Sequence, residues 1–219
     1  MNGDNHLFVW TADEIARGEI PAEHARELTE VLRWSQDFLV SPHPDLGRGG
    51  PVCPYTQPSL RRDLFYIAVP RDPRADLSKT VARLRSWHER LSTGLDEEER
   101  ELLAVLIVLP GLDYTDSTEL DLLQRKAKDD FVANGLMIGQ FHPVCDEPGL
   151  WNPSFRPLRA PVPLLAVRRM LVFDLLFLVG DLGHADSYLR RFAPAIPARV
   201  RHQLVTRLVS TDSREALSA

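Results

Sequence analysis

Several features are scarce or missing in this 219-residue sequence, and each absence argues against a class of protein. Two cysteines cannot form a disulfide framework. The N-terminus lacks the basic and apolar regions of a signal peptide, and the longest apolar run, residues 102–110, is about half of a membrane span. The net charge of −5 lacks the basic excess typical of nucleic-acid binders. We therefore expect a soluble, cytoplasmic protein that binds neither nucleic acid nor membrane.

Common nucleotide, zinc and redox motifs are also missing. The sequence contains no GxGxxG, GxxxxGK[ST], HExxH, CxxC or GxSxG pattern and no repeat with a period of 20–50 residues. Its composition is that of an ordinary globular chain, with 44% hydrophobic and 26% charged residues. The length is consistent with one domain, which we assign to residues 1–219.

Hydrophobic spacing predicts both helices and strands. The helices are expected over residues 22–39, 77–92, 117–133, 182–192 and 197–210. Strands are expected over 64–69, 102–109 and 136–141, with a helix from Glu97 as the alternative for the second and residues 164–167 left open. The boundary signals are a capping box from Thr11 to Glu14, a helix cap at Asp76 and a helix end at Asn134-Gly135.

This order of elements predicts an α+β fold, with a small mixed β-sheet covered by helices in a single domain. Residues 1–40 would form an N-terminal helical segment, residues 50–170 the α+β core, and residues 182–210 the C-terminal helices.

Proline is unevenly distributed. Of the 17 prolines, seven lie in residues 42–73 and six in residues 143–163. Such residues stiffen loops, and functional side chains are often carried by loops on a rigid scaffold. We expect these two proline-rich loops to meet over one end of the sheet and to hold the site.

His142 is the sharpest candidate in these loops, because it ends a predicted strand and is followed by Pro143. A neutral imidazole there would suit a metal or haem iron, and the alternative is a hydrogen-bonded, half-buried histidine. Cys53 and Cys145 are either thiolate groups or small buried hydrophobes. Together with His43 and His142 they would supply four zinc ligands, although this spacing matches no standard zinc module.

Arginines form pairs in this acidic chain. Arg61 with Arg62, and Arg156 with Arg159, could bind haem propionates or an acidic substrate, or form surface salt bridges. The pairs 168–169 and 190–191 are expected to be solvated, and His88 to be a core histidine with satisfied hydrogen bonds.

Three segments, taken in order, carry a family resemblance. They are Cys-Pro-Tyr at 53–55, Gly-Gln-Phe-His-Pro at 139–143, and Arg-Pro-Leu-Arg-Ala-Pro-Val-Pro at 156–163. Together with the strands at 64–69 and 102–110, they resemble an uncharacterised bacterial domain family that is distantly similar to the YqcI/YcgG family. The resemblance covers roughly residues 50–170.

Some YqcI/YcgG proteins are haem-dependent N-oxygenases that act on an amine or guanidine nitrogen of amino acids. The resemblance implies that His142 is an axial iron ligand and that Arg156 and Arg159 face the propionates. Cys53 matches a cysteine to which we assign no role. The sequence departs from the pattern at Phe141, where those proteins have leucine, and by an insertion after Pro143.

The resulting expectation is a haem-binding oxygenase with a small-molecule substrate and an apolar haem pocket. The pocket would be lined by Phe65, Ile67, Met137 and Phe141. A second axial ligand is left open among His43, His88 and His184, and a homodimer is left open as well. The alternatives are a non-haem metal or cofactor-free enzyme that uses the same loops, and a non-catalytic protein that docks through residues 182–210.

Overall fold

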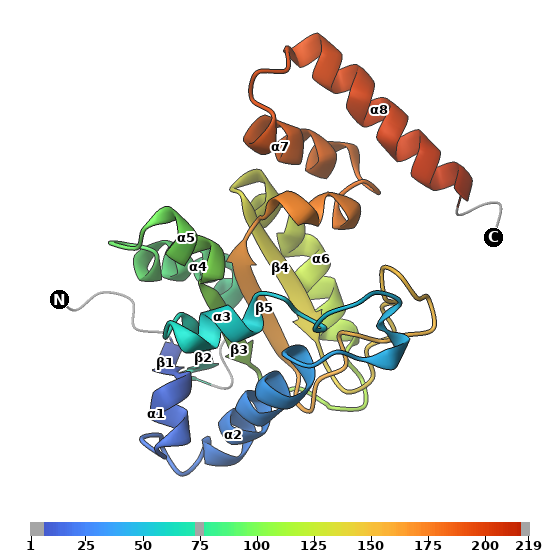
Figure 1. Ribbon diagram of the computed structural model, residues 1–219. Coiled ribbons are helices and arrows are strands. Elements are labelled where there is room, and N and C mark those ends of the chain that lie inside the picture. The colour runs from blue at the N-terminus through green and yellow to red at the C-terminus, as the bar shows by residue number, and fades with distance from the viewer. Residues whose placement is uncertain (1–6, 73–76, 216–219) are drawn as a thin grey trace.

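The computed structural model, which describes residues 7–72 and 77–215, is built on a five-stranded mixed sheet with the order β1-β2-β3-β5-β4 (Figure 1). The strands are β1 (Leu7–Thr11), β2 (Phe65–Pro70), β3 (Ala104–Val108), β4 (Leu136–Phe141) and β5 (Leu164–Arg169). Strands β2 and β3 pair in parallel, and the other neighbours pair antiparallel. Strands β2, β3 and β4 therefore run in one direction, and β1 and β5 in the other.

The helices confirm the expected α+β class. They are α1 (Ala12–Ala16), α2 (Ala25–Trp34), α3 (Thr56–Arg61), α4 (Leu77–Leu91), α5 (Glu97–Leu102), α6 (Thr118–Ala133), α7 (Leu182–Phe192) and α8 (Ala198–Glu215). Shorter turns are the π-helix η1 (Ser35–Leu39) and the 3₁₀ helices η2 (Pro44–Leu46) and η3 (Val172–Phe177).

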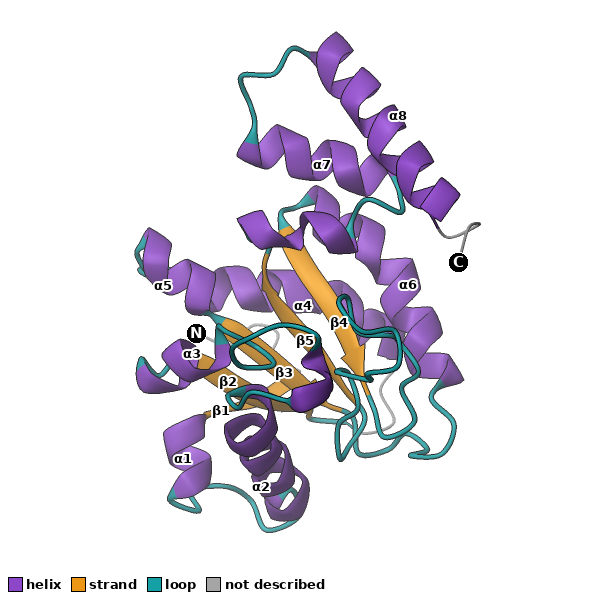
Figure 2. Cartoon of the chain, turned by 45° about the vertical axis from the view of Figure 1, so that its right-hand side comes forward, coloured by secondary structure: helices purple, strands orange, loops and turns teal. Residues whose placement is uncertain are grey.

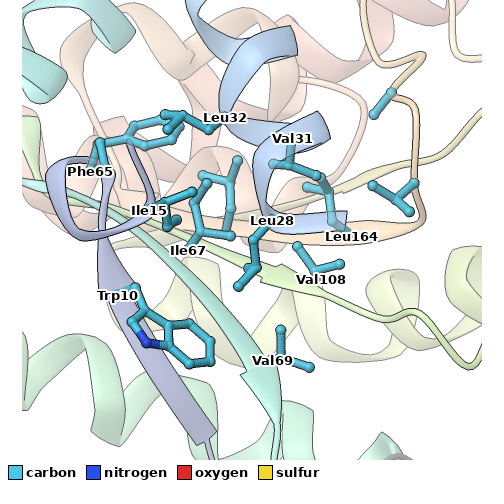
Figure 3. Packing of buried hydrophobic residues seen from close by; sticks show 14 residues of the cluster. Trp10, Ile15, Leu28, Val31, Leu32, Phe65, Ile67, Val69, Val108 and Leu164 are labelled. Carbon is cyan, nitrogen blue, oxygen red and sulfur yellow. The ribbon is translucent and has the colours of Figure 1, made fainter. Parts of the chain in front are cut away.

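Helix α2 covers one face of the sheet, here called the α2 face. Leu28 and Val31 are fully buried there against Ile67 of β2 and Leu164 of β5, in a cluster completed by residues of α1, β1 and β3 (Figure 3). Burying one such side chain contributes about 1.5–3 kcal/mol. The spacing of the apolar residues in α2 thus determines which side of the helix packs on the sheet. Helix α2 also contacts η1, which leads into the first proline-rich loop.

Helices α4 and α6 cover the opposite face, here called the α6 face. Val81 of α4 and Leu120 and Phe131 of α6 pack on Ile107 of β3 and Leu165 of β5. Alternate residues of each strand therefore contribute to two separate cores, one on each side of the sheet.

The C-terminal helices extend beyond one end of the sheet (Figures 1 and 2). Tyr188 of α7 is buried with Val132 of α6 and Met170, and α8 packs on α7. The preceding turn η3 leaves Phe173 75% exposed. Among the described helices, none combines the length and the apolar character needed to cross a membrane.

The boundary signals agree with the structure where it describes them. Thr11 and Glu14 form the capping box of α1, and Gly135, with φ of 73°, follows the end of α6 in the left-handed conformation. The predicted cap at Asp76 lies outside the described residues.

Some predicted elements were wrong. Residues 1–40 are not purely helical, since β1 lies at their beginning and pairs with β2. The apolar run at 102–109 is divided between the end of α5 and β3. Residues 164–167, which the sequence left open, belong to β5, and this strand lies between β3 and β4. The first proline-rich loop includes α3, with Pro58 in its first turn, where a missing N–H costs little.

Candidate functional site

The carboxyl end of β4 holds a buried histidine that is paired with a partly exposed aspartate. His142 follows the last residue of β4 and is 3% exposed, and its Nε2 lies 3.2 Å from Oδ1 of Asp121 on α6. The other ring nitrogen, Nδ1, is buried and has no hydrogen-bond partner among the described residues. One ring nitrogen of His142 is therefore oriented by a carboxylate, and the other has no hydrogen-bond partner among the described residues.

The second proline-rich loop closes around this histidine through main-chain hydrogen bonds. The His142 carbonyl accepts from the N–H groups of Cys145 and Ala160, at 3.2 and 3.3 Å, and its own N–H donates to Leu158. These bonds join the beginning and the end of the loop at His142. The site is thus held by the backbone of the loop as well as by α6.

Two predicted arginines belong to this loop and lie near the pair. Arg159 donates from Nε to the Cys145 carbonyl at 3.1 Å and from Nη2 to Asp146 at 3.0 Å, while Nε of Arg156 lies 3.7 Å from Asp146. The two arginines therefore converge on Asp146, four residues after His142 in the sequence.

Cys145 has the environment of an unreactive thiol. It is 1% exposed, and burial raises the pKa of its thiol; the Glu147 N–H acts in the opposite direction and the charge of Asp121 raises the pKa further. A thiol with a raised pKa stays protonated at neutral pH. The geometry thus favours His142 over Cys145 as the chemically useful group.

The two proline-rich loops meet, as expected. The Asn152 side chain donates to the Asp45 carbonyl at 2.8 Å, and the ring centroids of His43 and Phe155 lie 4.6 Å apart. A Cβ at Gly47 would lie 2.7 Å from the Trp151 carbonyl oxygen, so this close approach requires glycine.

Phe141 does not share a pocket with His142. It packs with the α2-face core and meets the ring of Trp34 edge-on at 5.7 Å, whereas His142 is bonded to α6 on the other face. Phe65 and Ile67 are also on the α2 face. The expected apolar haem pocket of Phe65, Ile67, Met137 and Phe141 around His142 is therefore not formed, because successive strand residues point to opposite faces.

The arginines of the first loop and Cys53 lie elsewhere. Arg61 and Arg62 come just before β2 begins, which is the opposite end of the sheet from His142, and Arg62 pairs with Glu98 at 2.7 Å. Cys53 lies near Arg168, at the carboxyl end of antiparallel β5. The three residues are thus separated from the histidine that they were expected to assist.

The proposed zinc quartet is not assembled. Among the described residues, no group of three or more His, Cys, Asp and Glu side chains is placed to hold a metal ion. His43 accepts from the Asp45 N–H at 3.1 Å, and His184 pairs with Asp129 at 2.8 Å. His88 lies near the beginning of β4, at the other end of that strand from His142.

Some important residues were missed or misassigned from sequence. Asp121 lies outside the apolar stripe of α6, and only the packing of α6 on β4 reveals its partner. Arg168 is not solvated: it forms two hydrogen bonds with Asp174, which is 4% exposed. Burial acts to lower the pKa of Arg168, but the hydrogen bonds and charge of Asp174 raise it above its ordinary value.

The fold and the site define a class: an α+β domain in which a buried histidine at the end of an edge strand is paired with an aspartate. The chain belongs to the family described as Domain of unknown function (DUF6875), whose model matches residues 28–203. No curated protein and no solved structure matches the chain.

Proposed function

We propose that this domain works through His142, and that haem is the group that its imidazole takes. The observation that carries the proposal is the Asp121–His142 pair at 3.2 Å, with Nδ1 buried and without a partner. Histidines that ligate a metal usually donate their other ring N–H to a carboxylate or carbonyl, which fixes the tautomer and makes the ligating nitrogen more basic. Asp121 has this position relative to His142.

The loop after His142 offers one feature that suits haem. Arg156 and Arg159 are anchored in this loop, and guanidinium groups can pair with propionates in place of the Asp146 carboxylate that the two arginines share. The apolar walls of a haem pocket are not formed around the histidine, so haem binding requires the loop to rearrange.

One feature requires movement of the loop. Because His142 is only 3% exposed, iron reaches Nδ1 only if part of residues 143–163 is displaced. Haem, when bound, would supply oxygen chemistry; the family resemblance suggests an amine or guanidine nitrogen of an amino acid as the substrate. The roles of the chain are narrower: His142 would hold the iron through Nδ1, and Asp121 would orient the ring.

The test is reconstitution of the purified full chain with haemin, followed by absorption spectroscopy. A Soret band that is lost in His142→Ala and kept in His184→Ala supports the proposal. His184, on α7, is the matched control because its ring also pairs with an aspartate, Asp129. A spectrum equal to that of free haemin, or an unchanged band in His142→Ala, would refute haem ligation by this residue.

A second candidate is cofactor-free acid–base catalysis by the same pair. It is favoured by the Asp121–His142 hydrogen bond, since a carboxylate that orients an imidazole and stabilises its charged form is a recurring arrangement in general acid–base catalysis. Under this alternative, haemin gives no specific band, whereas His142→Ala still removes the turnover of a substrate found by screening.

A further inference from the structure

A second polar site lies at the opposite end of β4 from His142. A pocket of about 160 Å³ is formed where α4, α5, α7 and the turn before β4 come together. This volume is enough for a small oxyanion with some hydration. Its polar lining includes His88, Ser92, Arg100, Arg169 and Arg191.

Two of these side chains carry buried nitrogen atoms without a hydrogen-bond partner among the described residues. They are Nη1 of Arg169 and Nε of Arg191. Buried polar atoms in native proteins are almost always paired, so two unpaired guanidinium nitrogens on residues that line one pocket need an explanation. Guanidinium groups only donate hydrogen bonds, and the missing partner is therefore an acceptor.

The charges at the pocket also favour an anion. Glu97 pairs with Arg169 at 2.6 Å and lies 4.0 Å from Arg100, but its side chain is 68% exposed and approaches from the outside. Burial lowers the pKa of Arg191, and the like charge of Arg169 lowers it further, while Glu97 and Glu101 act in the opposite direction. Two guanidinium groups are thus held near each other with incomplete compensation.

Gly135 provides the space that this arrangement requires. Its φ of 73° is left-handed, and a Cβ built there would lie 2.7 Å from Nη1 and 3.3 Å from Cζ of Arg191. A side chain at this position would push the guanidinium out of the pocket. The turn between α6 and β4 is thus shaped to accept Arg191 from α7.

We propose that this pocket binds a phosphate group, either as the free ion or as part of a small phosphomonoester. Arginine forks match phosphate oxygens in geometry as well as in charge, and the lining holds three arginines, Arg100, Arg169 and Arg191. The site is roughly 20 Å from His142 along β4, at about 3.3 Å per residue. It is therefore independent of the proposed haem site.

The test is calorimetric titration of the full chain at fixed ionic strength with inorganic phosphate, glycerol phosphate and acetate. We expect saturable binding of at least one phosphate probe at one site per chain, with a dissociation constant of about 1 mM or tighter. Tighter binding of inorganic phosphate identifies the free ion as the ligand, and tighter binding of glycerol phosphate identifies a phosphomonoester. The absence of saturable phosphate binding, or acetate binding as tight as phosphate, would overturn the proposal.

Variants of the lining arginines test whether phosphate binds in this pocket. Arg191→Gln should weaken phosphate binding by about tenfold or more, while Arg190→Gln, on the outward side of α7 and paired with Asp186, should leave it unchanged. Equal losses in the two variants would mean general charge attraction and contradict a built site. If Arg191→Gln does not fold, Arg100→Gln provides the same test, because the Arg100 side chain is 43% exposed and its replacement leaves the core intact.

Discussion

The carboxylate of Asp121 lies 3.2 Å from Nε2 of His142, although 21 positions separate the two residues in the sequence. Helix α6 presents the aspartate and the end of β4 presents the histidine, so the pair exists only because α6 packs on this face of the sheet. The pair joins a partly exposed carboxylate on α6 to a buried histidine just before the second proline-rich loop.

Removing the charge of Asp121 should weaken the binding of haemin through His142. Asp121→Asn keeps a polar group of the same size and loses the carboxylate, and we expect haemin affinity to fall about 10- to 100-fold, the usual range for such partners. The measurement is a haemin titration followed by absorbance. Asp129→Asn removes the corresponding partner of His184 and is the matched control. Equal affinity in the wild type and Asp121→Asn would show that the pair is not a ligand-orienting device.

Asp174 should be among the most sensitive positions for stability. Asp174→Ala leaves the partly buried Arg168 guanidinium, whose side chain is 28% exposed, without its carboxylate, and we expect the free energy of unfolding to fall by about 2–3 kcal/mol. Urea unfolding of both proteins measures this difference. Glu98→Ala breaks the exposed pair with Arg62 and should cause a much smaller change. Similar losses in the two variants would contradict the structural role of the buried pair.

The α2-face core depends on Leu28. Leu28→Ala removes a fully buried side chain from the contact between α2 and the sheet, and we expect a loss of about 3 kcal/mol in the free energy of unfolding. Leu122→Ala, at a position that is 45% exposed, should change stability by no more than about 0.5 kcal/mol. Chemical denaturation compares the two, and equal effects would mean that α2 does not anchor this face.

His88 should make stability depend on pH. Burial lowers its pKa from 6.5 to about 4, the Leu103 carbonyl partly opposes this, and the charge of Arg169 lowers it further. The unfolded chain therefore takes up the proton first as the pH falls, and the stability contributed at pH 7 is lost between about pH 6.5 and 4. From pH 7 to pH 5 this amounts to about 2 kcal/mol.

The check is urea unfolding at pH 7 and pH 5 for the wild type, His88→Phe and the exposed-site control His202→Gln. His88→Phe should lose less stability on acidification than the wild type, and His202→Gln should lose the same amount. An unchanged pH dependence in His88→Phe would show that His88 does not titrate as its burial requires.

Local patterns were enough to predict much of the fold. Helices α4, α6 and α7 and strand β4 have the expected positions because their apolar period or composition is strong within one segment. Strand β1 was missed because it is defined by pairing with β2, with Leu7 opposite Pro70. Strand β5 was ambiguous because a short apolar run does not distinguish a buried strand from a helix.

The site was only partly predictable for the same reason. The proline-rich loops and His142 could be singled out from local chemistry, and the meeting of the loops follows from their stiffness and position. The opposite orientation of Phe141 follows from strand alternation and was predictable from the sequence. The partner of His142 and the convergence of Arg169 and Arg191 depend on which elements pack together. These relations are between residues far apart in the sequence, and no local pattern contains them.

The central claim is that His142 ligates haem, and the most direct measurement is the absorption spectrum of haemin-reconstituted protein compared with His142→Ala. Haem ligation by His142 predicts a Soret band at one haem per chain in the wild type and in His184→Ala, and its loss in a folded His142→Ala variant. A wild-type spectrum that stays that of free haemin, or a band that persists in His142→Ala, would contradict it.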